Sequence, residues 1–245
     1  MAIPSVPNRP GEPARLRSAS PLPQALIVKV YSYIVAHDSG FAPNPFHDAC
    51  TLACCKPVVR GRAEAGDIVV GLSRRSERVV YAMQVDEVAD FGDYWNMAAF
   101  AAKKPVFPTG SAIELCGDNI YEPDGKDSFR QAPSFHSNVD GTEHAGNKRR
   151  DLSSRSVLVA RRFTYFGQEA PPIPVSLTFL SVGRGHRCRF SCAEVRAVSE
   201  WFARLPHGIV GLPSGWPQTE GQSQGGRACA QLGGGEADAT PARPR

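Results

Sequence analysis

The residues best suited to chemistry begin in a turn-rich loop, His37 to Phe46, where Asn44 stands between two prolines. Proline restricts the backbone on both sides, so the Asn44 amide is held in one orientation. An amide presents a donor and an acceptor that match a nucleobase edge, and Asp38 in the same loop adds a carboxylate. A rigid surface turn is the alternative interpretation of this loop.

A second polar region follows over residues 105–155, which are long and aperiodic. A loop of this length inside a compact domain is usually functional or disordered. Asp118, Asn119, Tyr121 and His136 are polar groups able to contact a ligand, whereas disorder explains 139–152, which lacks apolar anchors. Asp118 and His136 are also potential metal ligands, but two ligands do not define a site.

Aromatic and basic residues complete the candidate binding groups. Tyr33, Trp95 and Tyr121 could stack on an unpaired base, although many aromatic residues are simply core. Basic side chains could contact phosphate or could remain solvated surface, and the candidates are Lys56, Arg74, Arg75 and Arg184. Arg184 lies in a glycine-rich segment that also fits a plain turn.

The cysteines allow a further chemistry. The chain has seven, and Cys50, Cys54 and Cys55 are close together. A thiol nucleophile needs a nearby base, for which the candidates are His47, His136 and His186, but the spacing does not define a triad. A zinc site built on His47 and these cysteines lacks a second ligand pair. Buried structural thiols are therefore expected, with no metal and no cofactor.

The surrounding elements follow from local patterns. Residues 25–36 predict a buried strand, and 66–73 with 78–88 predict a hairpin, since these segments are rich in β-branched and aromatic residues. Asp48 is a plausible cap and Pro57 a plausible stop for a helix over 48–55.

Later in the chain, residues 93–103 predict a helix ended by Pro105, and 156–167 predict a strand. Ser191 and Glu194 form a capping box that opens a final helix. This order predicts one α+β domain over 25–215, a compact and strongly bent barrel or sheet with helices packed outside.

Composition narrows the class of protein. A chain of 245 residues that is 42% hydrophobic and 21% charged can bury a core, which excludes fibrous and fully disordered chains. No stretch approaches the roughly 20 apolar residues of a membrane span, and no secretory signal is recognised, so a cytoplasmic location is expected. The Pro-rich segment 1–24 and the Gly-rich segment 216–245 are predicted to be disordered. The net charge of +4 permits an anionic partner.

An ordered set of motifs over roughly 25–215 resembles a known family, the nucleotide modification associated domain of the second type. The motifs begin with Tyr31 to Phe46 and Cys50 to Pro57, continue with Gly66-Asp67, Tyr81 to Met83 and Tyr94-Trp95, and end with Gly117 to Tyr121, Phe163 to Gly167 and Gly183 to His186. The Gly66-Asp67 hairpin is also similar to a strand of PUA-like barrels of the EVE, ASCH and YTH group.

The resemblance implies a role beside systems that hypermodify bases in the DNA of bacteria and phages. The first hypothesis is a module that recognises a modified base or nucleotide, with DNA as its partner and without catalysis. The second is an enzyme acting on a nucleotide or base, with Asp38 or Asp118 and His136 in acid–base roles. The third is a thiol- or metal-dependent regulatory protein that uses His47 and the neighbouring cysteines. The oligomeric state is not predicted.

Overall fold

Strands with alternating side chains build the centre of the fold in the computed structural model, which describes residues 28–75 and 77–216. In the strand Ile68–Leu72, Ile68 and Leu72 face one apolar cluster, whereas Val69 faces another. Gly71 in the same strand is required, because a Cβ there would lie 2.2 Å from the Tyr81 ring. Both faces of the sheet that contains this strand are therefore covered by apolar side chains.

The largest sheet has six strands in the order β10-β1-β3-β4-β9-β11. β1 runs parallel to β3 and β11 parallel to β9, and the other neighbours are antiparallel. The strands are β1 (Val30–Ile34), β3 (Ile68–Leu72), β4 (Val79–Gln84), β9 (Phe163–Tyr165), β10 (His186–Arg187) and β11 (Gly208–Ile209).

A second, antiparallel sheet has the order β2-β8-β5 and packs against the first through apolar side chains such as Leu52 and Leu158. Its strands are β2 (Cys50–Leu52), β8 (Ser156–Ala160) and β5 (Glu87–Asp90). Beyond it lies a hairpin of β6 (Tyr121–Pro123) and β7 (Phe129–Gln131).

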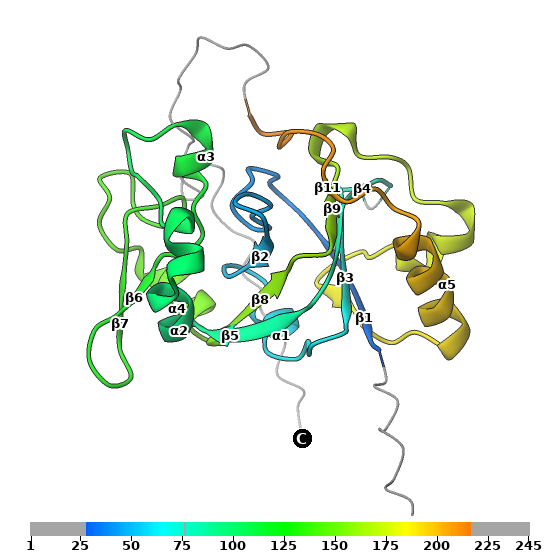
Figure 1. Ribbon diagram of the computed structural model, residues 1–245, viewed down its shortest axis with the longest axis horizontal. Helices are drawn as coiled ribbons and strands as arrows, with labels where there is room; N and C mark the ends of the chain where they lie inside the picture. Colours follow the sequence, from blue (N-terminus) through cyan, green and yellow to red (C-terminus); the bar gives the residue numbers. More distant parts are fainter. Residues whose placement is uncertain (1–27, 76, 217–245) are drawn as a thin grey trace, which may run out of the picture.

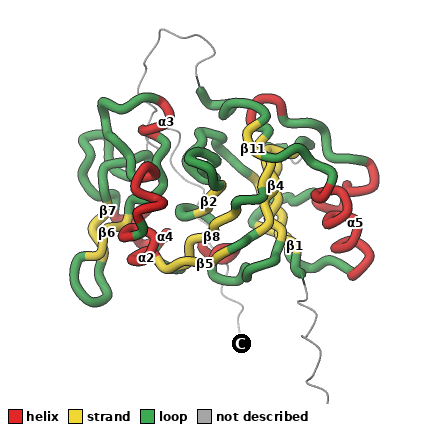
Figure 2. The backbone as a smooth tube through the Cα atoms, viewed as in Figure 1, coloured by secondary structure: helices red, strands yellow, loops and turns green. Residues whose placement is uncertain are grey.

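The α-helices of the described residues, apart from α1, fall into two groups. The helix α5 lies beside the six-stranded sheet, whereas α2, α3 and α4 gather with β6 and β7 on the opposite side of the molecule (Figure 1). Loops carry much of the chain between them (Figure 2). The helices are α1 (Pro57–Arg60), α2 (Phe91–Asn96), α3 (Ala112–Leu115), α4 (Ala145–Asp151) and α5 (Cys192–Ala203), with 3-10 helices at Ala98–Lys103, Gly167–Glu169 and Val175–Leu180.

The predicted α+β class is confirmed, but the expected barrel is not closed. The segment predicted as one strand over 156–167 is two strands, β8 and β9, which belong to different sheets. The break falls at Arg161 and Arg162, where the chain leaves one sheet for the other. β10 and β11 remain the two edges of the larger sheet.

The predicted helix over 48–55 is wrong. Cys50–Leu52 is the strand β2, which pairs with β8, and Pro57 begins α1 instead of ending a helix. Proline fits the first turn of a helix because the N–H it lacks would have no partner there. The hairpin is confirmed as β3 and β4, but the strand predicted over 78–88 ends at Gln84, and Glu87 begins β5 of the other sheet. The capped helix α5 is confirmed, and the helix over 93–103 is divided into α2 and a 3-10 helix.

Residues 139–152, which the sequence favours as disordered, contain α4. The helix is held by polar contacts: the His144 side chain caps it, and Asn147 is buried. Of the two segments predicted to be disordered, 1–24 and 216–245, only Trp216 lies within the described residues, and its ring stacks on Phe46. Among the described helices, none has the length and apolar character of a membrane span.

Candidate active site

Cys55 lies in a strained turn between β2 and α1. Cys55 and Lys56 both have left-handed backbones, with φ of 60° and 40°, before Pro57 starts the helix. Residues other than glycine rarely adopt this conformation, and such residues cluster at functional sites. Cys54 is fully buried, whereas Cys55 as a residue is partly exposed.

His136 is fixed by a compact turn over Ser134 to Ser137. The Ser137 hydroxyl donates to the Ser134 carbonyl at 2.8 Å and accepts the Ser134 N–H at 3.0 Å. The His136 carbonyl accepts the Asn147 side-chain amide at 3.0 Å, and its ring packs on Phe41 with centroids 4.7 Å apart. The imidazole is therefore buried and held in one orientation.

Asp151, at the end of α4, orients the other two groups. Its carboxylate lies 2.5 Å from His136 Nδ1, accepts the Tyr121 hydroxyl at 2.8 Å and accepts the Cys55 backbone N–H at 2.8 Å. Burial opposes ionisation of Asp151, but the neighbouring His136, the Arg60 guanidinium and the Cys55 N–H outweigh it and lower the pKa of this carboxyl. Burial and Asp151 raise the pKa of Tyr121, which keeps its hydroxyl a donor.

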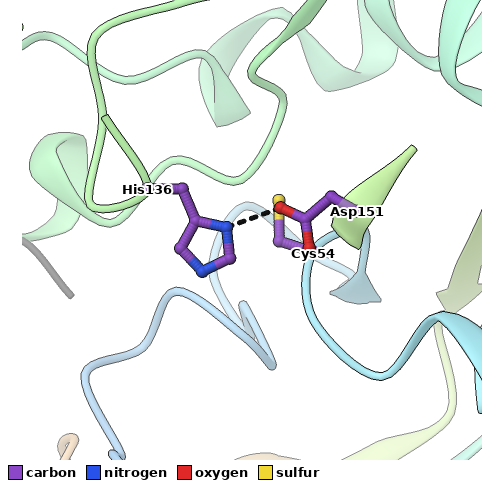
Figure 3. Close-up of side chains that lie close together, drawn as sticks. All are labelled: Cys54, His136 and Asp151. Carbon is purple, nitrogen blue, oxygen red and sulfur yellow. Dashed lines mark hydrogen bonds and ion pairs between the residues drawn. The ribbon is translucent and has the colours of Figure 1, made fainter. Parts of the chain in front are cut away.

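The three groups form a relay. Cys55 Sγ lies 3.4 Å from His136 Nε2, and the other ring nitrogen faces Asp151. A thiol beside an imidazole that a carboxylate orients is the arrangement of an activated nucleophile. Figure 3 shows the His136 ring facing the Asp151 carboxylate, with the Cys54 sulfur beside that carboxylate.

Arg60 joins the segments that carry these groups. Its side chain is fully buried and donates to the carbonyls of Cys55 at 2.8 Å, Asp151 at 2.6 Å, Ser154 at 2.9 Å and Ser156 at 2.5 Å. A planar guanidinium satisfies several carbonyls at fixed angles, which fixes the Cys55 turn against the end of α4.

Four of the residues predicted from the sequence surround Cys55. His136 contacts its thiol, and Tyr121 donates to Asp151. Lys56 follows it directly, with Nζ 5.2 Å from the centre of the Tyr33 ring. The Tyr33 hydroxyl is itself hydrogen-bonded to that of Tyr81 at 2.8 Å.

Asn44, Asp118 and Asn119 lie together in the interior, not at an opening. The Asn44 amide donates to the Cys116 carbonyl and accepts Lys103 Nζ at 2.6 Å, and the Asn119 amide donates to the carbonyls of Tyr94 and Phe100. The Asp118 carboxylate accepts the hydroxyls of Thr51 and Tyr94, each at 2.7 Å. These side chains are occupied by contacts within the protein.

Lys103 is the buried cation of this network. Its ammonium donates to Asn44 and to the Ala49 carbonyl, and it is fully buried. Burial lowers the pKa of Lys103 to about 8, although Asp118 favours the charged form. Burial likewise raises the pKa of Asp118, against the opposing effect of Lys103.

The remaining predicted residues belong neither to the Cys55 relay nor to the Lys103 network. Asp38 is buried and bonded to the Tyr165 hydroxyl and to the Ser214 N–H. Trp95 is partly exposed, with Lys104 Nζ 3.9 Å from its ring centre. Arg74, Arg75 and Arg184 are exposed on turns.

Asp151 is the residue of the candidate site that sequence reasoning missed. It follows the basic run Lys148 to Arg150 in a segment without apolar anchors, so nothing in the local pattern marked it as buried. The grouping of His47 with the neighbouring cysteines, on which the third hypothesis depends, is not observed among the described residues. In the described part of the chain, the grouping of metal-ligating types is Cys54, His136 and Asp151.

The fold and site define the class: an α+β domain with a Cys-His-Asp relay in which His136 and Asp151 are buried and Cys55 is a partly exposed residue. The chain belongs to the family described as nucleotide modification associated domain 2, whose model matches residues 27–220. Neither a curated protein nor a solved structure matches the chain. The family relates the domain to nucleotide modification.

Proposed function

We propose that this domain carries out thiol-dependent chemistry on a nucleotide or on a base of a nucleic acid, with Cys55 as the nucleophile. The observation that carries the proposal is the contact of Cys55 Sγ with His136 Nε2 at 3.4 Å, while His136 Nδ1 is bonded to Asp151. Membership of the nucleotide modification family supports the substrate class.

Each member of the relay has one task. As the Cys55 sulfur adds to C6 of a pyrimidine, its proton passes to His136 and the electron pair of the C5=C6 double bond moves into the conjugated ring. When the sulfur–carbon bond breaks, that double bond is restored and His136 returns the proton to the Cys55 sulfur. Asp151 stabilises the imidazolium that forms and holds the ring in the required orientation. Cys55 is partly exposed, so the substrate approaches from its solvent side.

Binding groups flank the thiol. Lys56 provides a cation beside Cys55 that can neutralise a phosphate. The Tyr33 ring contacts the Lys56 ammonium, and the Tyr121 hydroxyl donates to the Asp151 carboxylate, so both tyrosines hold site residues in place. Arg74, Arg75 and Arg184 remain predicted phosphate contacts on the surface. In this proposal Asn44, Asp118 and Asn119 hold the loops in place instead of bonding a base edge, and Asp38 holds the loop before them.

Recognition of a modified base without turnover is the second candidate. The observation that favours it is the pairing of Trp95 with Lys104 at the surface, 3.9 Å from ring centre to ammonium. An indole beside a cation can stack on a base while the cation meets the phosphate. Binding of this kind also fits an enzyme that first captures its substrate.

The test uses oligonucleotides with unmodified or 5-hydroxymethylated pyrimidines. After incubation, nucleosides and any protein–oligonucleotide adduct are measured by mass spectrometry. We expect a changed nucleoside or a Cys55 adduct with the native protein and with Cys192→Ala, and neither with Cys55→Ala. We also expect Cys55→Ala to keep binding, with an affinity that falls as salt rises.

Turnover that survives Cys55→Ala would contradict the nucleophile. Binding by the native protein without turnover or adduct would instead favour the recognition module.

A further inference from the structure

We propose that Cys54, His136 and Asp151 form a binding site for one thiophilic divalent cation, with Zn²⁺ as the expected ion. One sulfur, one ring nitrogen and one carboxylate oxygen lie within 4.8 Å of one another, and all three residues are buried. The side chains converge from three separate segments of the chain (Figure 3).

The donor set suits zinc. Thiolate, imidazole and carboxylate are the ligands that Zn²⁺ takes in proteins, at about 2.0–2.3 Å. Hard cations such as Mg²⁺ favour oxygen-only sites, so the sulfur selects against them. Cys54 releases its thiol proton on binding. The resulting thiolate and the Asp151 carboxylate then carry two negative charges, beside the two positive charges of the ion and the one of the buried Arg60 guanidinium.

The surrounding structure holds the donors in place before any ion arrives. Arg60 bonds to the carbonyls of Cys55 and Asp151, which fixes the Cys54 turn against the end of α4. The Ser134 to Ser137 turn fixes His136. A site whose donors are already oriented loses little ordering free energy on binding.

Metal binding and the relay exclude each other. A metal-bound imidazole cannot also accept a proton, so an ion at this site takes His136 out of the Cys55 pair. Zinc would therefore inhibit chemistry at Cys55. This consequence rests on the proposed function, whereas the site itself does not.

The test is titration of the full chain with Co²⁺ and Zn²⁺ after treatment with a chelator. We expect one equivalent of Co²⁺ with a thiolate-to-cobalt absorption band, and displacement of that ion by Zn²⁺. Outer-shell changes at metal sites cost roughly 10–100-fold in affinity, so loss of a direct ligand in Cys54→Ala or Asp151→Asn should cost at least that much. Cys192→Ala, which removes an exposed thiol outside the cluster, should bind as the native protein does.

If Cys54→Ala and Asp151→Asn bind Co²⁺ with the affinity of the native protein, or if the native protein gives no sulfur-to-cobalt band, the proposed site is wrong. A cooperative thermal unfolding transition in each variant shows that the variant is folded before its metal affinity is compared. Two variants are used so that the test still stands if one of them does not fold. Iodoacetamide reactivity of Cys55 in metal-free protein tests the nucleophile separately, so failure of one proposal is distinguishable from failure of the other.

Discussion

At the scale of single residues, the site depends on buried polar groups whose hydrogen bonds are satisfied. Arg60 is the clearest case, because one side chain serves four carbonyls on both sides of the site. Asp151 is the second, because its carboxylate has three different donors. Removing a partner from such a group leaves a buried polar atom without a hydrogen bond, which costs about 1–3 kcal/mol.

The residue-scale prediction is that Arg60→Lys destabilises the protein although it keeps the charge. A lysine has no planar fork, so it leaves several of the four carbonyls unpaired, and we expect a loss of about 2–4 kcal/mol. Urea denaturation measures the change. Arg62→Lys, at an exposed position nearby, is the matched control and should change stability by less than about 0.5 kcal/mol. Equal effects of the two variants would show that the Arg60 contacts matter little.

At the scale of elements, the pairing of β2 with β8 brings the reacting groups together. Leu52, at the end of β2, lies opposite Leu158 of β8. The strands are antiparallel, so the chain leaving β2 toward Cys55 meets the chain that arrives from α4 and Asp151. The Lys103 network anchors the other side of β2, since Thr51 bonds to Asp118 and Lys103 to Asn44.

The element-scale prediction concerns Lys103. Lys103→Met takes the neighbouring cation away from the buried Asp118 carboxylate and the ammonium donor away from the Ala49 carbonyl, so we expect a loss of about 3–5 kcal/mol at pH 7. Lys104→Met, at the surface over Trp95, should cost about 1 kcal/mol or less.

The difference in free energy of unfolding between the native protein and Lys103→Met should also increase with pH. The folded pKa of Lys103 is about 8, below its ordinary 10.5, so the unfolded chain binds more protons above pH 8 and native stability rises there. From pH 7 to pH 9 the gap grows by about 1 kcal/mol, and effects of the buried thiols cancel in the difference. A gap that stays constant in urea denaturation at the two pH values would mean that Lys103 titrates normally.

At the scale of the whole molecule, the sequence predicts strands, the hairpin and the capped helix α5, because their patterns are local. It does not predict that 156–167 splits between two sheets, since periodicity says nothing of where strands pair. His136 is a candidate base from its residue type alone, but Asp151 has no local signal: its burial depends on contacts with Cys55, Tyr121 and His136 from distant segments. The family motifs include the Cys50 to Pro57 segment, but they do not predict which of its thiols contacts His136.

The most direct measurement is competitive alkylation of the metal-free protein by iodoacetamide at neutral pH, with each cysteine quantified by mass spectrometry. We predict that Cys55 reacts at least about tenfold faster than the more exposed Cys192, and that His136→Gln removes this difference, because a thiol paired with a base is more nucleophilic than a solvated one. If Cys55 reacts no faster than Cys192, or keeps its rate in His136→Gln, Cys55 is not the activated nucleophile.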